Sequence, residues 1–187
     1  MRKILLALVF LFVATGVSAD NENLYYMFED KPHIKVYLKE ATSEVNDPAV
    51  SINEFKRIFD DVHRNRVNIK FMPVDSPDKA DVIVTAKIVS YSMTERALPS
   101  LFGAAALVAD TTSPKSSATL SVNYTIIDAE TGKVLSEFDN FKTDARRRVR
   151  NMKGAKAFEF AAEKNISRFI YRAFHKQKPK AHEVGDN

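Results

Sequence analysis

The residue types that most often bind metals or carry out catalysis are few and scattered in this chain. The four histidines, His33, His63, His175 and His182, have no second ligand at a spacing used for zinc. The chain has no cysteine, and its five glycines form neither a phosphate-binding loop nor a nucleophile elbow. We therefore expect no metal site, no cofactor and no catalytic residue, and we predict that the protein is not an enzyme.

Two adjacent carboxylates, Asp60 and Asp61, come closest to an acid–base pair. On a polar helix face, such a pair is far more often solvated charge than a catalytic couple. A hydrolase whose site no motif reveals is therefore kept only as a third and weaker hypothesis.

A basic stretch in the second half of the chain has the chemistry to bind anions. Its charged residues, apart from Asp144, are all cationic: Lys142, Arg146, Arg147, Arg148, Arg150, Lys153 and Lys156. Blocks of like charge are most often solvated loops, but they also attract anionic lipid, lipopolysaccharide, peptidoglycan or nucleic acid. No aromatic residue is interleaved among the arginines for base stacking, and an exported protein rarely meets nucleic acid, so we expect no nucleic-acid partner. The candidate contacts for an anionic envelope polymer or lipid are Arg146, Arg147, Arg148, Arg150 and Lys153.

An uncharged, mostly apolar segment separates two predicted strands. It spans residues 98–109 and reads Leu-Pro-Ser-Leu-Phe-Gly-Ala-Ala-Ala-Leu-Val-Ala. Connections of this kind are usually polar and exposed, so these side chains need burial. They either pack on the protein's own core or form a contact surface for another protein or a membrane. In the second alternative, the candidate partner-binding residues are Leu98, Leu101, Phe102, Leu107 and Val108.

The first 19 residues have the pattern of a secretory signal peptide. Arg2 and Lys3 precede an apolar run at residues 4–13, and small residues at 17–19 match a cleavage site. An apolar run of about ten residues is too short to cross a bilayer. We therefore expect cleavage that leaves Asp20 as the first residue of the mature protein.

Export without cysteine indicates a bacterial envelope protein rather than a secreted eukaryotic domain. We predict a periplasmic location, with peripheral association with the outer membrane as an open alternative. A leader at residues 20–32 follows the signal and contains an apolar cluster at 24–28. We expect this cluster to pack on the protein's own fold, and the alternative is that it tethers the chain to a complex.

The hydrophobic periodicity predicts an α+β fold in a single domain, residues 33–176, followed by a mobile tail at 177–187. Strands are predicted at residues 33–39, 67–71, 82–91, 118–128 and 133–143, and helices at 51–66 and 154–175. Ser51 and Glu54 form a capping box, and Gly132 ends a turn where it can take a positive φ. The order β-α-β-β-β-β-α predicts a largely antiparallel sheet of about five strands, with two helices packed on one face.

Several short stretches resemble a bacterial protein family. They are Ala-Asp-Val-Ile-Val-Thr-Ala-Lys-Ile at 80–88, Arg-Ala-Leu at 96–98, Phe-Gly-Ala-Ala at 102–105 and the strand and turn at 122–135. Residues 35–174 are thereby similar to uncharacterised small bacterial envelope proteins, many of them lipoproteins. Those in turn resemble the periplasmic domains of the curli secretion lipoprotein and of the penicillin-binding-protein activator lipoprotein. The resemblance implies an envelope location and no catalytic residue, and this chain lacks the cysteine that carries lipid in the lipoprotein members.

Together these observations predict a non-enzymatic, exported binding or assembly component of the bacterial cell envelope, with an envelope protein as its partner. The alternative is an envelope-surface binder of an anionic ligand, namely lipopolysaccharide, anionic lipid or peptidoglycan, through residues 142–156. The identity of the partner and the oligomeric state are not determined by the sequence.

Overall fold

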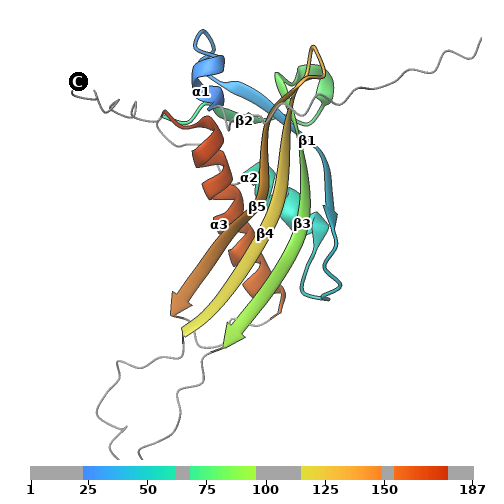
Figure 1. The fold of residues 1–187 in the computed structure, drawn as a ribbon, viewed down its shortest axis with the longest axis vertical. Helices are drawn as coiled ribbons and strands as arrows, with labels where there is room; N and C mark the ends of the chain where they lie inside the picture. Colours follow the sequence, from blue (N-terminus) through green and yellow to red (C-terminus); the bar gives the residue numbers. More distant parts are fainter. Residues whose placement is uncertain (1–22, 62–67, 96–114, 149–153, 177–187) are drawn as a thin grey trace, which may run out of the picture.

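The computed structural model describes residues 23–61, 68–95, 115–148 and 154–176. Within these ranges the centre of the fold is one five-stranded open sheet, in the order β2-β1-β3-β4-β5 (Figure 1). The strands are β1 (Ile34–Ser43), β2 (Phe71–Pro73), β3 (Val82–Glu95), β4 (Lys115–Asp128) and β5 (Val134–Arg148).

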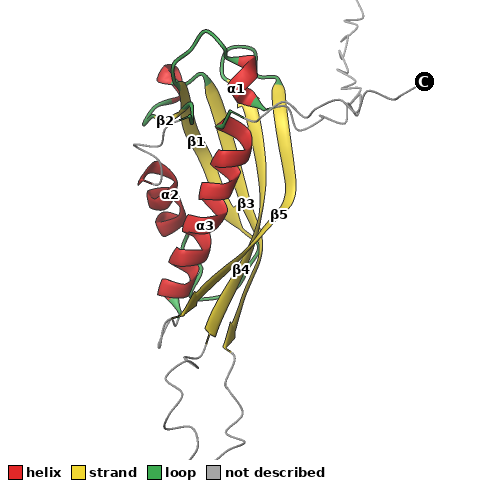
Figure 2. Cartoon of the chain, turned by 90° about the vertical axis from the view of Figure 1, so that its left-hand side faces the viewer, coloured by secondary structure: helices red, strands yellow, loops and turns green. Residues whose placement is uncertain are grey.

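Two helices, α2 (Ile52–Asp61) and α3 (Ala155–Phe174), cover the same face of this sheet, and the described part of the chain has no helix on the opposite face (Figure 2). A four-residue helix, α1 (Leu24–Met27), and a 3-10 turn, η1 (Pro77–Lys79), lie at the end of the sheet where β2 is found (Figure 1). The predicted α+β class, with two principal helices on one face of the sheet, is confirmed.

The long strands β3, β4 and β5 pair antiparallel, as the sequence predicts. β1 runs parallel to both of its neighbours, β2 and β3. The parallel pairing with β2 has a physical reason: α2 lies between these two strands in the chain, and a helical crossover returns the chain in the same direction.

The core lies between the sheet and the two helices, because alternate strand residues point toward the helices. The apolar strand faces expected from the sequence are buried as predicted: Val82, Val84, Ala86, Ile88, Leu120, Val122, Tyr124 and Ile126. The apolar stripe predicted on α3 is also buried: Phe158, Ala161, Ala162, Ile166, Phe169, Ile170 and Ala173. One continuous cluster therefore joins the sheet to α3.

The turn between β4 and β5 has the predicted conformation. Gly132 has a φ of 70°, and the carboxylate of Asp128 accepts hydrogen bonds from the backbone N–H groups of Glu130 and Thr131. The hydroxyl of Thr131 donates to the same oxygen, and these bonds, those from Thr131 foremost, lower the pKa of Asp128. Asp128 and Gly132 thus fix the start of β5.

β1, β3 and β4 are each a few residues longer than predicted, and the structure differs most from the sequence prediction in the other two strands. β2 has only three residues, since Asn68 has a φ of 70° and Ile69 forms an isolated bridge with His175 instead of joining the sheet. β5 is longer than predicted and continues to Arg148, because its backbone keeps pairing with β4 as far as Lys115. Three arginines of the basic stretch therefore lie in a strand and not in a loop.

Candidate binding surface

The residues predicted to contact partners fall partly outside the described residues. Leu98, Leu101, Phe102, Leu107 and Val108 lie in the undescribed range 96–114, and Arg150 and Lys153 lie in the undescribed range 149–153. The backbone of the other candidate residues is placed: Arg146, Arg147 and Arg148 are the last three residues of β5.

Strand pairing brings the two predicted contact segments to one end of the molecule. β3 ends at Glu95 and β4 begins at Lys115, so residues 96–114 both leave and re-enter the sheet there. Arg148 pairs with Lys115 across β4 and β5, and Arg147 pairs with Ser116 (Figure 1). We call this end, formed by Glu95, Lys115 and residues 146–148, the basic end. The apolar segment and the basic stretch are separated by about thirty residues in the chain. Both are thus connected to the same end of the sheet, where β3 and β5 end and β4 begins.

A buried hydrogen-bond network on α3 fixes the orientation of β5 near the basic end. Asn165 is fully buried, and its side-chain amide donates to the Phe141 carbonyl at 2.8 Å and the Thr143 hydroxyl at 3.1 Å. It also donates to the Leu120 carbonyl at 3.2 Å and accepts from the Tyr124 hydroxyl at 2.7 Å. Because Thr143 faces the helix, its neighbours in β5 alternate to the opposite, uncovered face.

The charged residues of β5 that lie beside Thr143 are therefore exposed on the uncovered face. Lys142 and Asp144 are both exposed, and Ala145 returns to the buried side. Asp144 accepts a hydrogen bond at 2.8 Å from the hydroxyl of Thr119, its partner on β4. This carboxylate is thereby held against the sheet while Lys142 stands in solvent.

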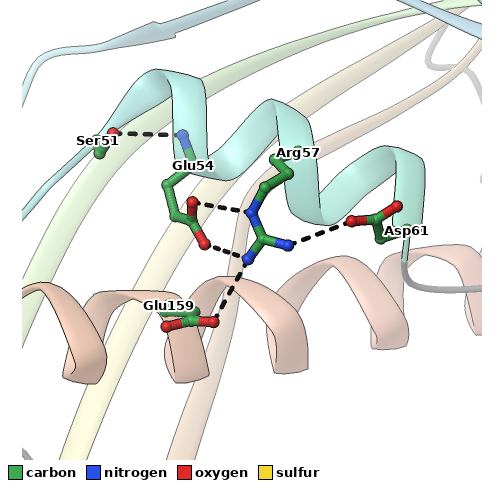
Figure 3. Close-up of polar contacts among 5 residues, drawn as sticks. All are labelled: Ser51, Glu54, Arg57, Asp61 and Glu159. Carbon is green, nitrogen blue, oxygen red and sulfur yellow. Dashed lines mark hydrogen bonds and ion pairs between the residues drawn. The ribbon is translucent and has the colours of Figure 1, made fainter.

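A second charged cluster joins the two helices and has a structural role. The hydroxyl of Ser51 accepts from the N–H of Glu54, which is half of the predicted capping box (Figure 3). The Glu54 carboxylate binds the guanidinium of Arg57 instead of reaching back, and this bond lowers the pKa of Glu54. Arg57 also pairs with Asp61 at 3.2 Å and with Glu159 of α3 at 3.4 Å. Asp61 is therefore part of an exposed ion-pair network, in agreement with its interpretation as solvated charge.

The leader packs on the fold, as expected, but as a helix that sequence periodicity did not reveal. Leu24 is fully buried in the core, and the Asn23 side chain donates to the carbonyls of Arg172 and His175 at the end of α3. Lys70, which is only 8% exposed, donates to the carbonyls of Phe28 at 2.7 Å and Glu29 at 3.0 Å. A lysine between two apolar residues of a predicted strand was the available signal for this contact.

An open hollow of about 570 Å³ with a mixed polar and apolar lining lies beside the leader, lined by Tyr25, Tyr26, Glu29, Asp30, Lys31, Pro32, Lys70 and Lys176. Two of its ammonium groups are already engaged, since Lys70 binds backbone carbonyls and Lys31 pairs with Asp81 at 2.6 Å. Burial alone would raise the pKa of Asp81, but the bonds from Lys31 and from the Lys35 N–H hold it below its ordinary value. The hollow therefore offers a ligand less free charge than its composition indicates.

Neither a metal-binding cluster nor a membrane-spanning helix is found in the described ranges. In them, no three histidine or carboxylate side chains are placed to hold a metal ion. Nor does any helix there have the length and apolar character needed to cross a bilayer.

Comparison with known proteins gives only distant structural matches. No protein-family model and no curated protein matches the chain. The hypothetical protein CT253 from Chlamydia trachomatis aligns with a TM-score of 0.44 at 14% identity, over 75% of this chain and 98% of that one. The PelC dodecamer from Paraburkholderia phytofirmans aligns with a TM-score of 0.44 at 11% identity, over 78% and 90% of the two chains. Lipoprotein GNA1162 from Neisseria meningitidis aligns with a TM-score of 0.36 at 11% identity, over 65% and 88%. At these values the matches assign neither a family nor a function, and the resemblance to the curli and penicillin-binding-protein activator lipoproteins stays a prediction.

Proposed function

We propose that this chain is a non-enzymatic, exported binding component of the bacterial cell envelope and that the basic end is its contact surface. The observation that supports the proposal is the register of β4 with β5, which sets Lys115 against Arg148 where residues 96–114 join the sheet. Export and the envelope location are inferred from the N-terminal sequence pattern.

The two segments joined at the basic end would contribute differently to binding. Apolar side chains in 98–108 would supply contact area, which is largely insensitive to salt. The arginines would attract negatively charged partners over a distance of about 10 Å at 0.1 M salt. An envelope protein that docks on the apolar segment is the first candidate partner, and an anionic envelope ligand held by the arginines is the second.

Two multiple variants separate these candidates in an affinity capture from an envelope extract, read by mass spectrometry. One variant replaces Leu101, Phe102 and Leu107 by Ser, and the other replaces Arg146, Arg147, Arg148 and Arg150 by Gln. If a protein partner docks on the apolar segment, the serine variant should lose capture with its fold intact, and the glutamine variant should only associate more slowly.

The opposite pattern would favour the anionic ligand: the glutamine variant loses all capture, and the wild-type complex dissociates at moderate salt. Circular dichroism and thermal unfolding control for the fold. An unfolded serine variant would show that the apolar segment belongs to the protein's own core. If both variants still captured the same partners as the wild type, neither segment would be the contact surface and the proposal would be contradicted.

A further inference from the structure

The two edges of the sheet differ in their protection against pairing with another chain. β2 forms one edge, and it has only three residues and ends with Pro73, which has no N–H group to donate. β5 forms the other edge, with 15 residues and no proline (Figure 1). Short strands and prolines are common means of preventing strand addition at an edge. β2 is therefore a protected edge, and β5 lacks both of these protections.

The outer side of β5 is open in the described part of the chain. No strand there lies beyond β5, and no backbone hydrogen bond joins residues 134–145 to an element other than β4. Regular pairing with β4 at residues 141–145 begins after a bulge at Asn140, where φ is 48°. We call the outer side of residues 141–145 the β5 edge.

Hydrogen bonds from Asn165 show which backbone groups point away from the sheet at the β5 edge. The Asn165 amide donates to the carbonyls of both Leu120 and Phe141, so these carbonyls point into the space between β4 and β5. The direction of the backbone groups alternates along a strand. The N–H and C=O groups of Lys142 and Asp144 therefore point outward, where an added strand would pair with them.

A row of cations on α3 borders the β5 edge on the helix side. Lys164, Arg168 and Arg172 are spaced four residues apart and so lie on one flank of the helix, and we call them the cationic row. The guanidinium of Arg172 lies 6.0 Å from the ring centre of Phe138 on β5, whereas Glu159 on the opposite flank reaches α2. Neither Lys164 nor Arg168 forms an ion pair with another described residue. Their charge is therefore available to a ligand at the β5 edge.

The other side of the β5 edge carries no net formal charge. Lys142 and Asp144 are both exposed there, and Asp144 also accepts a hydrogen bond from the hydroxyl of Thr119. Glu137 and Asp139, the other exposed acids of β5, come before Asn140 and lie outside the β5 edge. An added strand would thus meet uncompensated positive charge only on the helix side.

From these placements we propose that the β5 edge binds an extended segment of a partner protein as a sixth strand, with acidic residues at alternate positions. In strand addition, backbone hydrogen bonds supply affinity and alternate side chains supply specificity. On the helix side, the side chains of the added strand would face the cationic row and should be carboxylates. On the other side they would meet Lys142 and Asp144, whose charges cancel, and should be neutral. The site lies before residues 146–148, so it is separate from the basic end and does not rest on the proposed function.

A second copy of the chain fits the β5 edge less well than an acidic segment. Two copies paired through β5 would bring their cationic rows next to each other, because adjacent strands are only about 4.8 Å apart. Like charges within about 10 Å still repel at 0.1 M salt. Charge complementarity therefore favours a partner strand with carboxylates over self-association.

The first experiment uses a blocked, fluorescein-labelled peptide of about nine residues in which Thr and Glu alternate. Fluorescence anisotropy at about 50 mM salt should show binding to the mature protein, and the same peptide with Lys in place of Glu should not bind. The bound peptide should slow hydrogen exchange at the backbone amides of Lys142 and Asp144, which otherwise face solvent. Absence of binding, or binding without this protection, would overturn the proposal.

Two N-methylated peptides test the backbone pairing without changing charge. One carries the methyl group on every Thr nitrogen and the other on every Glu nitrogen. Alternate N–H groups of an added strand point toward β5 and the rest point to solvent. Only one of the two peptides should therefore lose binding, and equal effects of the two methylations would overturn the proposal.

A pair of double variants tests the cationic row. Lys164→Gln with Arg168→Gln should weaken binding of the Thr–Glu peptide by about tenfold. Lys39→Gln with Lys56→Gln removes the same net charge from exposed positions on β1 and α2, and it should leave binding nearly unchanged. Equal effects of the two double variants would show nonspecific attraction to the net charge and would overturn the proposal.

Lys142→Pro tests the edge itself. It removes an outward N–H group and obstructs an added strand but breaks no hydrogen bond to β4, so binding should be lost with the fold intact by circular dichroism. Lys142→Gln, the control for the charge, should still bind the peptide. If the proline variant does not fold, the methylated peptides decide. A wild-type dimer in analytical ultracentrifugation that Lys142→Pro abolishes would identify a second copy as the occupant and overturn the proposal.

Discussion

Asn165 is the residue on which the pairing between α3 and the two last strands depends most directly. Its amide and carbonyl groups are all engaged, with partners on β4 and β5, in a part of the core that is otherwise apolar. Buried polar groups of this kind stabilise a fold only when every group has a partner, so this network also specifies the register.

We expect Asn165→Ala to lower the free energy of unfolding by about 3 kcal/mol, because it leaves the Tyr124 hydroxyl and two carbonyls without their partner. Chemical denaturation followed by circular dichroism measures this loss. Glu163→Ala, at an exposed position of the same helix, is the matched control and should change stability by less than about 0.5 kcal/mol. A loss below about 1 kcal/mol for Asn165→Ala would show that water replaces the amide.

The burial of Tyr124 predicts an alkaline limit to stability. Burial raises the pKa of Tyr124 well above its ordinary value of 10.0. Above about pH 10 the unfolded chain loses the proton of this tyrosine, whereas the folded protein keeps it. The contribution of Tyr124 to the free energy of unfolding is therefore fully present below about pH 10 and is lost as the pH rises.

Urea unfolding midpoints measured between about pH 8 and pH 11 check this dependence. In Tyr124→Phe the urea midpoint should decrease less steeply with pH. The variant also lacks a hydrogen bond, so its stability at neutral pH should be lower than that of the wild type. Burial raises the pKa of Tyr91 too, so some alkaline sensitivity should remain in the variant. An unchanged slope in Tyr124→Phe would assign the effect to other groups.

The position of Asn165 in the sequence contained a signal of its role. It falls between Ala162 and Ile166 within the apolar stripe of α3, where a polar residue has to be satisfied inside the core. The sequence could not identify its partners, because Phe141 and Thr143 are more than twenty residues away in the chain. Periodicity therefore predicts the buried face, and the contacts across it come only from the fold.

At the level of elements, Lys70 is the main link between the leader and the sheet. Its ammonium group caps the carbonyl end of α1 and lies 4.5 Å from the centre of the Tyr25 ring. A four-residue helix is too short to be stable by itself, so α1 depends on such tertiary contacts.

We expect Lys70→Met to release the leader while the sheet stays folded. Hydrogen exchange should become faster at the backbone amides of Tyr26 and Phe28, and protease cleavage between residues 24 and 31 should increase. Lys79→Met, which removes an exposed ammonium paired with Asp75, is the matched control. Unchanged exchange at Tyr26 and Phe28 would show that burial of Leu24 alone holds the leader.

The success of the element predictions follows the strength of their local patterns. α3 and the strands β3 and β4 were predicted closely, since each has a long regular period of buried residues. The last residues of β5 were missed because a run of arginines has no strand period, and only pairing with β4 extends the strand to Arg148. The basic residues were thus identified as a candidate surface from composition, but their place in a strand depends on the register with β4.

At the level of the whole molecule, the signal-peptide hypothesis makes a direct prediction. Mass spectrometry of the protein recovered from the periplasm should give a chain that begins at Asp20. This start lies three residues before Asn23, whose side chain binds the end of α3, so correct processing should leave the leader able to dock. An intact N-terminus on a cytoplasmic protein would contradict the localisation.

The two ends of the folded domain have different connections. Hydrogen bonds from Asn23 to the end of α3 keep residues 23 and 176 at the α1 end, and the basic end lies at the far tip of β3, β4 and β5 (Figure 1). A strand of 14 residues, such as β3, is about 46 Å long. A protein held at the α1 end of this domain would therefore present the basic end, which we propose as its contact surface, several nanometres away from residues 23 and 176, and it could then span the gap between two layers that do not touch.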